Sequence, residues 1–154
     1  MSRDRVEELR RLTQHFVRRF GALSADVTPC GKPLPLAHAH ALMVLLGQGE
    51  QRQQELGGEL GIDKSNVARL CAKMVELGHV VQRSCEHDGR SRLVSLTARG
   101  KRLALEVDAS SRARFGSLVQ ALPRDRRDDV LEALRLLVAA LEEPLQSDSA
   151  ARTP

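Results

Sequence analysis

Apolar residues recur at intervals of three and four along most of the chain, which predicts a largely helical protein. The first such segment covers residues 3–27 and is followed by helix breakers over residues 28–35. Residues 36–47 are apolar on nearly every side, so we expect this helix to be buried. Two further amphipathic helices are predicted over residues 98–121 and 124–143.

Two short helices are predicted in close succession in the middle of the chain. The first covers residues 53–60, and Gly61 stands where a helix-ending glycine belongs. Asp63 is an N-cap candidate for the second, over residues 64–77. Two such helices around a three-residue turn form a helix-turn-helix. At 100° per residue, the apolar side chains of the second helix share one side, namely Val67, Leu70, Cys71, Met74 and Leu77.

The opposite side of this second helix is polar and suits the major groove of DNA. We take its residues as candidate DNA contacts, together with the first residue of the helix: Lys64, Ser65, Asn66, Arg69 and Lys73.

After Gly78 the hydrophobic period changes from 3.6 to 2. Residues 79–84 and 92–97 are expected to be strands, with the turn of the hairpin at Asp88-Gly89. This hairpin has the position of the wing of a winged helix-turn-helix. Thr97 is predicted to cap the helix that follows.

The last helix carries more apolar surface than a single winged helix can bury, at Val130, Leu134, Leu137, Leu141 and Leu145. Long helices at both chain ends indicate a homodimer in which the ends interlock. We therefore assign residues 1–35 and 98–145 to a helical dimerisation region and residues 36–97 to the DNA-binding domain. Pro144 is expected to stop the helix, and residues 146–154 to form a disordered tail.

Composition narrows the function classes. Aromatic residues make up 2% of the 154 residues, with no Trp or Tyr, which argues against base-stacking RNA-binding folds. The sequence shows no apolar run of membrane-spanning length and no secretory signal, so a cytoplasmic protein with no membrane partner is expected. Catalytic motifs are also absent from the sequence, so neither an enzyme nor a cofactor is predicted.

The positive charge is concentrated in one segment. The net charge is +4, but residues 64–102 hold nine bases and three acids. A basic segment in an otherwise slightly acidic chain indicates a polyanion partner, here double-stranded DNA. The expected wing adds Arg83, Asp88, Arg90 and Arg92 to the candidate DNA contacts, with Arg90 placed to enter a narrow minor groove and Asp88 to orient it.

Over residues 5–145 the chain resembles the MarR family of bacterial transcriptional regulators. The resemblance is carried by an Asp88-x-Arg90 element in the wing, followed by Thr97-x-x-Gly100 at the next helix start, and by the helix-turn-helix segment. The chain departs from the family at Gly57-Gly58, where a better helix former is usual and where each glycine costs about 1 kcal/mol.

This resemblance implies a mainly α fold, with a winged helix-turn-helix, a two-stranded β-wing and long N- and C-terminal dimerisation helices. It also implies a pseudo-palindromic operator, repression by promoter occlusion, and a small-molecule effector bound between the dimerisation helices and the DNA-binding domain.

Two alternatives stay open. In the first, Cys30 makes the protein a thiol-redox or metal sensor. Cys30 precedes a helix start and lies near Lys32 in sequence, and His38 or His40 could join it in a sensing site or ligand pocket, although the two histidines point 200° apart. No metal site is assigned. In the second, the winged helix is a protein–protein interaction module, which the clustered positive charge disfavours.

Overall fold

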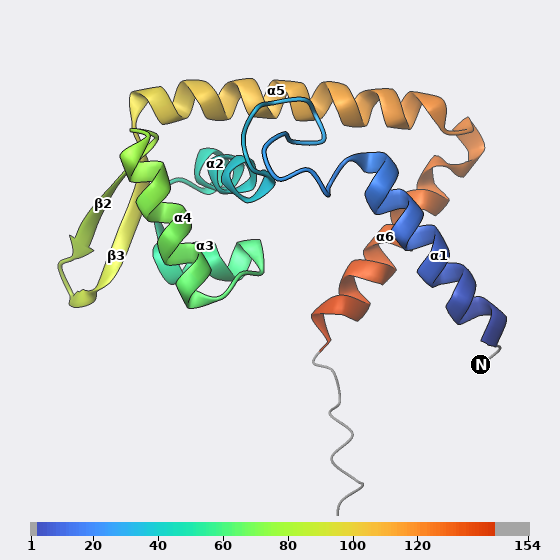
Figure 1. The fold of residues 1–154 in the computed structure, drawn as a ribbon, viewed down its shortest axis with the longest axis horizontal. Coiled ribbons are helices and arrows are strands. Elements are labelled where there is room, and N and C mark those ends of the chain that lie inside the picture. Colours follow the sequence, from blue (N-terminus) through green and yellow to red (C-terminus); the bar gives the residue numbers. More distant parts are fainter. Residues whose placement is uncertain (1–2, 144–154) are drawn as a thin grey trace, which may run out of the picture. The chain divides into compact units, whose positions relative to one another are not determined.

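The computed structural model describes residues 3–143, apart from the side chain of Asp88, and these residues form six α-helices and one small sheet (Figure 1). The mainly α winged-helix prediction is thereby confirmed. The chain divides into two compact units between Arg114 and Phe115, inside one continuous helix. Among the described helices, none has both the length and the apolar character needed to cross a membrane.

The first helix is shorter than the sequence predicted. Helix α1 covers Arg3–Phe20 and not residues 3–27. Gly21 follows it with φ of +90°, a left-handed conformation that an α-helix cannot continue through. The apolar periodicity beyond Gly21 therefore belongs to a loop.

Helix α2, Leu36–Gln48, lies in the middle of the core, as its sequence predicted. Pro35 precedes its first turn, where the missing N–H of a proline costs nothing, and Gly49 ends it with φ of +78°. The core combines α2 with side chains from the helix-turn-helix, the sheet and the next helix. Its largest fully buried side chains are Leu42, Leu56, Met74, Val67, Val80, Val94, Val107 and Cys71.

The helix-turn-helix consists of α3, Gln53–Leu60, and α4, Lys64–Glu76. Both predicted caps are confirmed. Gly61 is left-handed with φ of +65°, and the Asp63 carboxylate accepts a hydrogen bond of 2.8 Å from the backbone N–H of Asn66. Packing also explains why residue 57 is a glycine, because a Cβ atom there would lie 3.1 Å from a methyl carbon of Val67. The glycine thus lets α3 and α4 approach closely.

The sheet has three antiparallel strands in the order β1-β3-β2 and not the two that were predicted. Strands β2, Val80–Cys85, and β3, Asp88–Leu96, form the wing. The unpredicted strand β1, Gln51–Arg52, pairs with Leu93 and Val94 at the base of the wing. Two residues give no readable alternation, which is why the pattern missed this strand.

The turn of the wing also differs from the prediction. It lies at Glu86-His87, whereas Asp88 and Gly89 are already in strand β3. The register pairs Val80 with Leu96 and Cys85 with Asp88, so core burial of the strand bases sets the position of the turn. Gly89 does not adopt the positive φ that a tight Asp-Gly turn requires.

Helix α5, Ala98–Ala121, begins as predicted with Thr97 as its cap. Thr97 Oγ1 accepts the N–H of Gly100 at 2.9 Å and donates to the carbonyl of Gly78 at 2.6 Å. Gly100 is buried against the backbone carbonyl of His79, so close that a Cβ atom could not fit. The start of α5 is therefore tied to the end of α4 by backbone contacts.

In the described part of the C-terminal unit, the end of α5 is followed by a 3-10 turn, η1 at Arg124–Arg126, and by α6 at Arg127–Glu142. The predicted helix over residues 124–143 is thus confirmed, with a tighter first turn. The expectations for Pro144, Leu145 and the tail of residues 146–154 lie outside the described residues.

Candidate nucleic-acid interface

Helix α4 separates its apolar and polar residues as the sequence predicted. Val67, Cys71 and Met74 are buried, which holds the helix against the core. The candidate DNA contacts of this helix are all exposed, namely Lys64, Ser65, Asn66, Arg69 and Lys73. The polar side of α4 is therefore available to a large partner.

A short chain of hydrogen bonds orders part of this exposed side. The Asp63 carboxylate accepts the side-chain amide of Asn66 at 2.8 Å, and the amide oxygen of Asn66 accepts from the Arg69 guanidinium at 2.7 Å. Lys73 instead pairs with Glu76 at 3.2 Å. The bond to Asn66 thus restrains the Arg69 side chain on the exposed side of α4, and the guanidinium has N–H groups in excess of this one bond.

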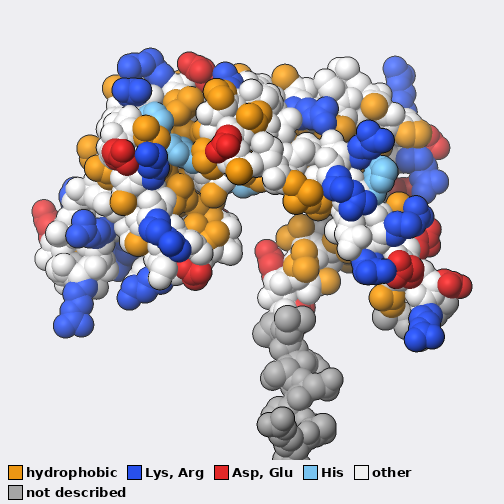
Figure 2. Space-filling view, in the orientation of Figure 1, with side chains coloured by type: hydrophobic (Ala, Val, Ile, Leu, Met, Phe, Trp, Pro, Cys, Tyr) orange, Lys and Arg blue, Asp and Glu red, His pale blue; other side chains and the backbone are white. Residues whose placement is uncertain are grey.

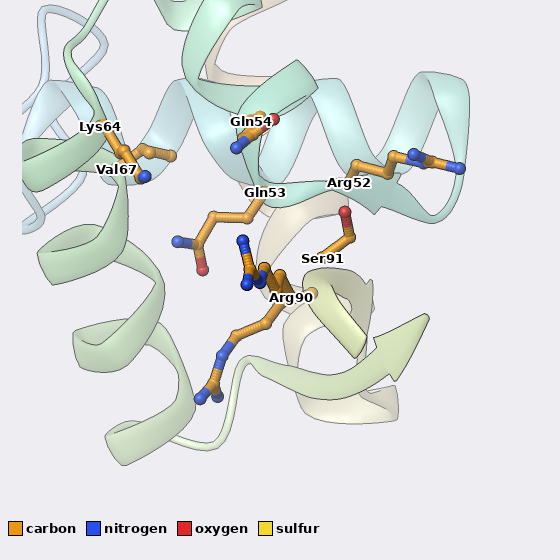
Figure 3. A pocket seen from close by; sticks show the side chains of 8 residues that line it. Arg52, Gln53, Gln54, Lys64, Val67, Arg90 and Ser91 are labelled. Carbon is orange, nitrogen blue, oxygen red and sulfur yellow. The ribbon is translucent and has the colours of Figure 1, made fainter. Parts of the chain in front are cut away.

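A basic pocket of about 320 Å³ lies between α4, the start of α3 and the wing (Figure 3). The cations that line it are Lys64, Arg90, Arg92 and Arg52. Figure 3 shows Arg90 and Ser91 on the wing side of this pocket and Lys64 on the α4 side. No carboxylate among the described side chains lines this pocket. The pocket joins the two elements that the sequence assigned to DNA.

Three lining residues of this pocket were missed by the sequence analysis. Arg52, Gln53 and Gln54 form the entry to α3, and Gln82 of β2 donates a 2.6 Å hydrogen bond to Gln53. A usable signal existed, because the N-terminus of a helix presents unpaired N–H groups that attract phosphate. The basic segment identified from the sequence began at Lys64, so it did not include Arg52.

One predicted wing residue, Arg83, does not line the pocket. Arg83 makes a two-pronged contact with Glu50, at 2.7 and 3.2 Å, which ties β2 to the segment before β1. The predicted role of Asp88 in orienting Arg90 concerns a side chain outside the described part of the structure. On the face seen in Figure 2, Lys and Arg side chains project from the wing and the helix-turn-helix.

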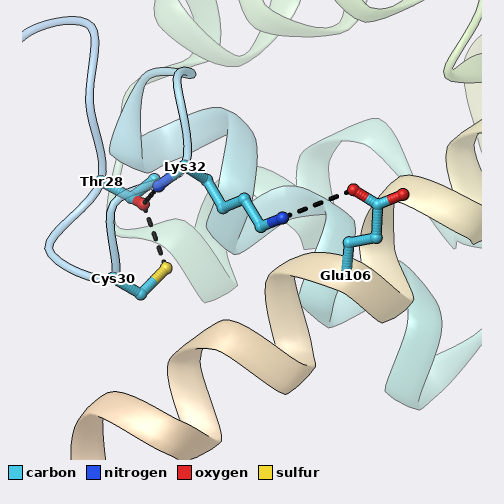
Figure 4. A network of polar contacts seen from close by, with 4 residues as sticks. All are labelled: Thr28, Cys30, Lys32 and Glu106. Carbon is cyan, nitrogen blue, oxygen red and sulfur yellow. Dashed lines mark hydrogen bonds and ion pairs between the residues drawn. The ribbon is translucent and has the colours of Figure 1, made fainter.

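The structure does not assemble the suggested sensing site from Cys30, His38 and His40. Cys30 Sγ lies 3.1 Å from the hydroxyl of Thr28, and Lys32 directs its ammonium to Glu106 at 3.4 Å (Figure 4). His38 is buried and bonded to His79, whereas His40 is exposed. Among the described residues, no group of three His, Cys, Asp or Glu side chains could hold a metal ion.

The other two thiols are buried in the described structure. Burial raises the pKa of Cys71 to about 11, so this thiol stays protonated at neutral pH. Cys85 is 8% exposed at the end of β2, a burial that its place in a wing did not predict.

Comparisons with known proteins agree with this geometry. Residues 32–91, the loop before α2 through most of the wing, match the model of the MarR family. No curated protein sequence matches the chain significantly.

Among solved structures, a MarR family protein from Bacillus stearothermophilus is 20% identical, with a TM-score of 0.69 over 92% of this chain and 98% of that one. A probable transcriptional regulator from Pseudomonas aeruginosa is 27% identical, with a TM-score of 0.61 over 86% and 92%. BpsR from Bordetella bronchiseptica, whose DNA binding is regulated by 6-hydroxynicotinic acid, is 21% identical, with a TM-score of 0.66 over 88% and 98%.

The family match covers the helix-turn-helix and every lining residue of the basic pocket except Arg92, and the fold match extends over nearly the whole chain. No enzymatic activity goes with this family. Residues 32–91 are therefore a winged helix-turn-helix that matches the MarR family of transcriptional regulators, and the described chain has the fold of the MarR family protein from Bacillus stearothermophilus.

Proposed function

We propose that the protein is a homodimeric repressor that occupies a pseudo-palindromic DNA operator and leaves it when a small ligand binds. One observation carries the DNA part of this proposal. Lys64 at the start of α4 and the wing arginines Arg90 and Arg92 line one basic pocket, and no acid is among the described side chains that line it. Such a surface attracts the phosphate backbone while α4 and the wing reach adjacent grooves.

The two elements should contact DNA differently. Helix α4 would enter the major groove, where Arg69 can donate two hydrogen bonds to a guanine edge. Arg90, near the turn of the wing, would lie in the minor groove, whose pattern distinguishes bases poorly. Arg52, Gln53 and Lys64 would then hold the phosphates between the two grooves.

Alanine substitutions should separate these roles. Arg69→Ala should weaken binding by about 1–3 kcal/mol and relax the preference at one base pair of each half-site, because a base contact is lost. Arg90→Ala should weaken binding to all sequences by a similar factor. The measurement is fluorescence anisotropy against a duplex selected from a randomised library and its single-base variants.

Arg112→Ala is the matched control for both, since Arg112 is an exposed arginine of α5 paired only with Asp108 at 2.8 Å. All three variants should have the same melting temperature as the parent protein. If Arg90→Ala binds as tightly as the parent at equal salt, the wing does not contact DNA.

Exposed apolar side chains support the homodimer. In α1, Val6, Leu9, Leu12 and Phe16 are each at least half exposed. In α6, the exposed apolar residues are Leu131, Leu134, Leu136, Leu137, Val138 and Leu141. Apolar patches of this kind on terminal helices usually mark an interface with another chain. A second copy is the partner that would also supply a second α4 for a two-fold operator.

A small aromatic acid is the favoured signal, because the similar structure of BpsR belongs to a protein whose DNA binding responds to 6-hydroxynicotinic acid. The thiol-sensor alternative has less support. Cys30 contacts Thr28 and not a cation, since the ammonium of Lys32 is paired with Glu106.

Ligand and oxidant signals can be separated with one substitution. Aromatic carboxylic acids, beginning with 6-hydroxynicotinic acid, should lower the operator affinity of the parent and of Cys30→Ser equally. Peroxide should not change the operator affinity of the parent. If peroxide releases the parent, dithiothreitol restores binding and Cys30→Ser ignores both, then Cys30 is the sensor and the ligand proposal is wrong.

A further inference from the structure

A buried pair of histidines connects α2 to the end of the DNA-contacting helix. His38 Nε2 of α2 and His79 Nδ1, just after α4, lie 3.0 Å apart and share a hydrogen bond. The ring centroids are 5.1 Å apart and the rings meet edge to face at 70°. The exposed fractions are only 3% for His38 and 9% for His79.

The backbone of His79 is the joint between three elements. Its N–H donates to the carbonyl of Met74 in α4 at 2.9 Å, and its carbonyl accepts the N–H of Thr97 at 3.1 Å. The same carbonyl packs against Gly100 of α5, and β2 begins at the next residue, Val80. The His38 ring therefore anchors the corner at which α4, the wing and α5 meet.

Both rings are neutral at pH 7. Burial, and then the proximity of His79, lower the pKa of His38 to about 4. Burial and the Arg99 guanidinium of α5 lower the pKa of His79. Among the side chains that the structure describes, no carboxylate hydrogen-bonds to either ring, and His40, the other titratable group of α2, is exposed. Nothing described here would therefore stabilise added positive charge.

We propose that the His38–His79 pair is a proton-sensitive latch that holds α4 and the wing in their DNA-binding position and releases them on acidification. A first proton can bind a nitrogen that faces away from the partner ring, so the shared hydrogen bond survives. A second proton leaves N–H groups on both facing nitrogens, which breaks this bond and places two cations beside Arg99. Moving His79 away from α2 relieves the repulsion between these cations and shifts the end of α4.

The size of the effect follows from proton linkage. A histidine that leaves the buried pair regains an ordinary pKa of about 6.5, so its protonation favours the released state. At pH 5 the ratio of released to latched protein rises by up to about 30-fold for each histidine that gains a proton. Acid should otherwise strengthen DNA binding, because it adds positive charge to the protein. The sign of the pH dependence is therefore diagnostic.

The test rests on the proposed DNA binding and uses the full chain at constant ionic strength. Anisotropy with a selected duplex between pH 7.5 and 5.0 should show the parent losing affinity on acidification, by up to about 30-fold for each histidine that gains a proton at pH 5. His38→Gln and His79→Asn carry a neutral amide close to the Nε2 and Nδ1 positions respectively, so they keep a hydrogen bond without titrating. In each single variant the DNA affinity should fall less on acidification than in the parent, and in the double variant it should not fall. His87→Gln, the matched control, should keep it.

Absence of DNA binding at pH 7.5 would overturn the proposed function and not the latch. Binding that strengthens or stays constant on acidification would overturn the latch. If the variants do not fold, the parent alone decides the matter by NMR. The latch requires that the His38 and His79 ring signals titrate together with the amide signals of α4 and the wing. If the ring signals titrate without any movement of those amides, there is no latch.

Discussion

The affinity of the protein for its operator is expected to fall about 10³-fold or more when the salt concentration is raised from 50 to 200 mM. A dimer that presents the pocket cations Arg52, Lys64, Arg90 and Arg92 twice makes enough phosphate contacts for a loss of this size. The slope of log affinity against log salt, measured by anisotropy, counts the counterions released.

Substitution in the pocket should change this slope in a defined way. Arg92→Ala should lower it by about one for each subunit without changing base preference, while Arg112→Ala should leave it unchanged. Sedimentation equilibrium of the complex should show two chains on one duplex. The half-sites of the selected duplex are expected to lie about 34–36 Å apart. A single chain on the duplex, or an affinity independent of salt, would contradict both the dimer and the phosphate contacts.

Gly100→Ala should destabilise the protein by about 3 kcal/mol, opposite in sign to the usual effect of replacing a helical glycine. The new methyl group would overlap the carbonyl oxygen of His79, a backbone atom that cannot rotate away. The structure must then open the joint between α4 and α5. Urea unfolding followed by circular dichroism measures the change in the free energy of unfolding.

Gly58→Ala is the matched control, because Gly58 is an exposed helical glycine with open space where its Cβ would lie. This substitution should stabilise the protein by about 0.5–1 kcal/mol. Equal effects of the two substitutions would show that contact with His79 does not determine the need for glycine at position 100.

Local chemistry made much of this fold predictable. Gly61, Asp63 and Thr97 act through neighbours within a few residues in the chain, so the sequence alone located the helix-turn-helix and the start of α5. The split between the apolar and polar sides of α4 follows from helical geometry in the same way. The polar side was therefore identified before any tertiary contact was known.

The features that the sequence missed depend on distant partners. The His38–His79 bond joins residues 41 apart in the chain, and the Arg83–Glu50 contact joins residues 33 apart. The turn of the wing is set by burial at the base of the strands, which outweighs the local preference of Asp88-Gly89. Arg83 illustrates the limit, since its charge was evident but its partner was not.

Strand β3 carries a core residue and a cation of the pocket two positions apart. Val94 is fully buried, and Arg92 follows on the same side of the strand toward the turn. A shift of one residue in the pairing would expose Val94 and turn Arg92 to the opposite side of the strand. A chain that folds with this error therefore also displaces a cation of the pocket. One pairing register thus sets both the packing of the core and the position of a cation that is proposed to contact DNA, so a substitution that shifts the register is expected to impair both.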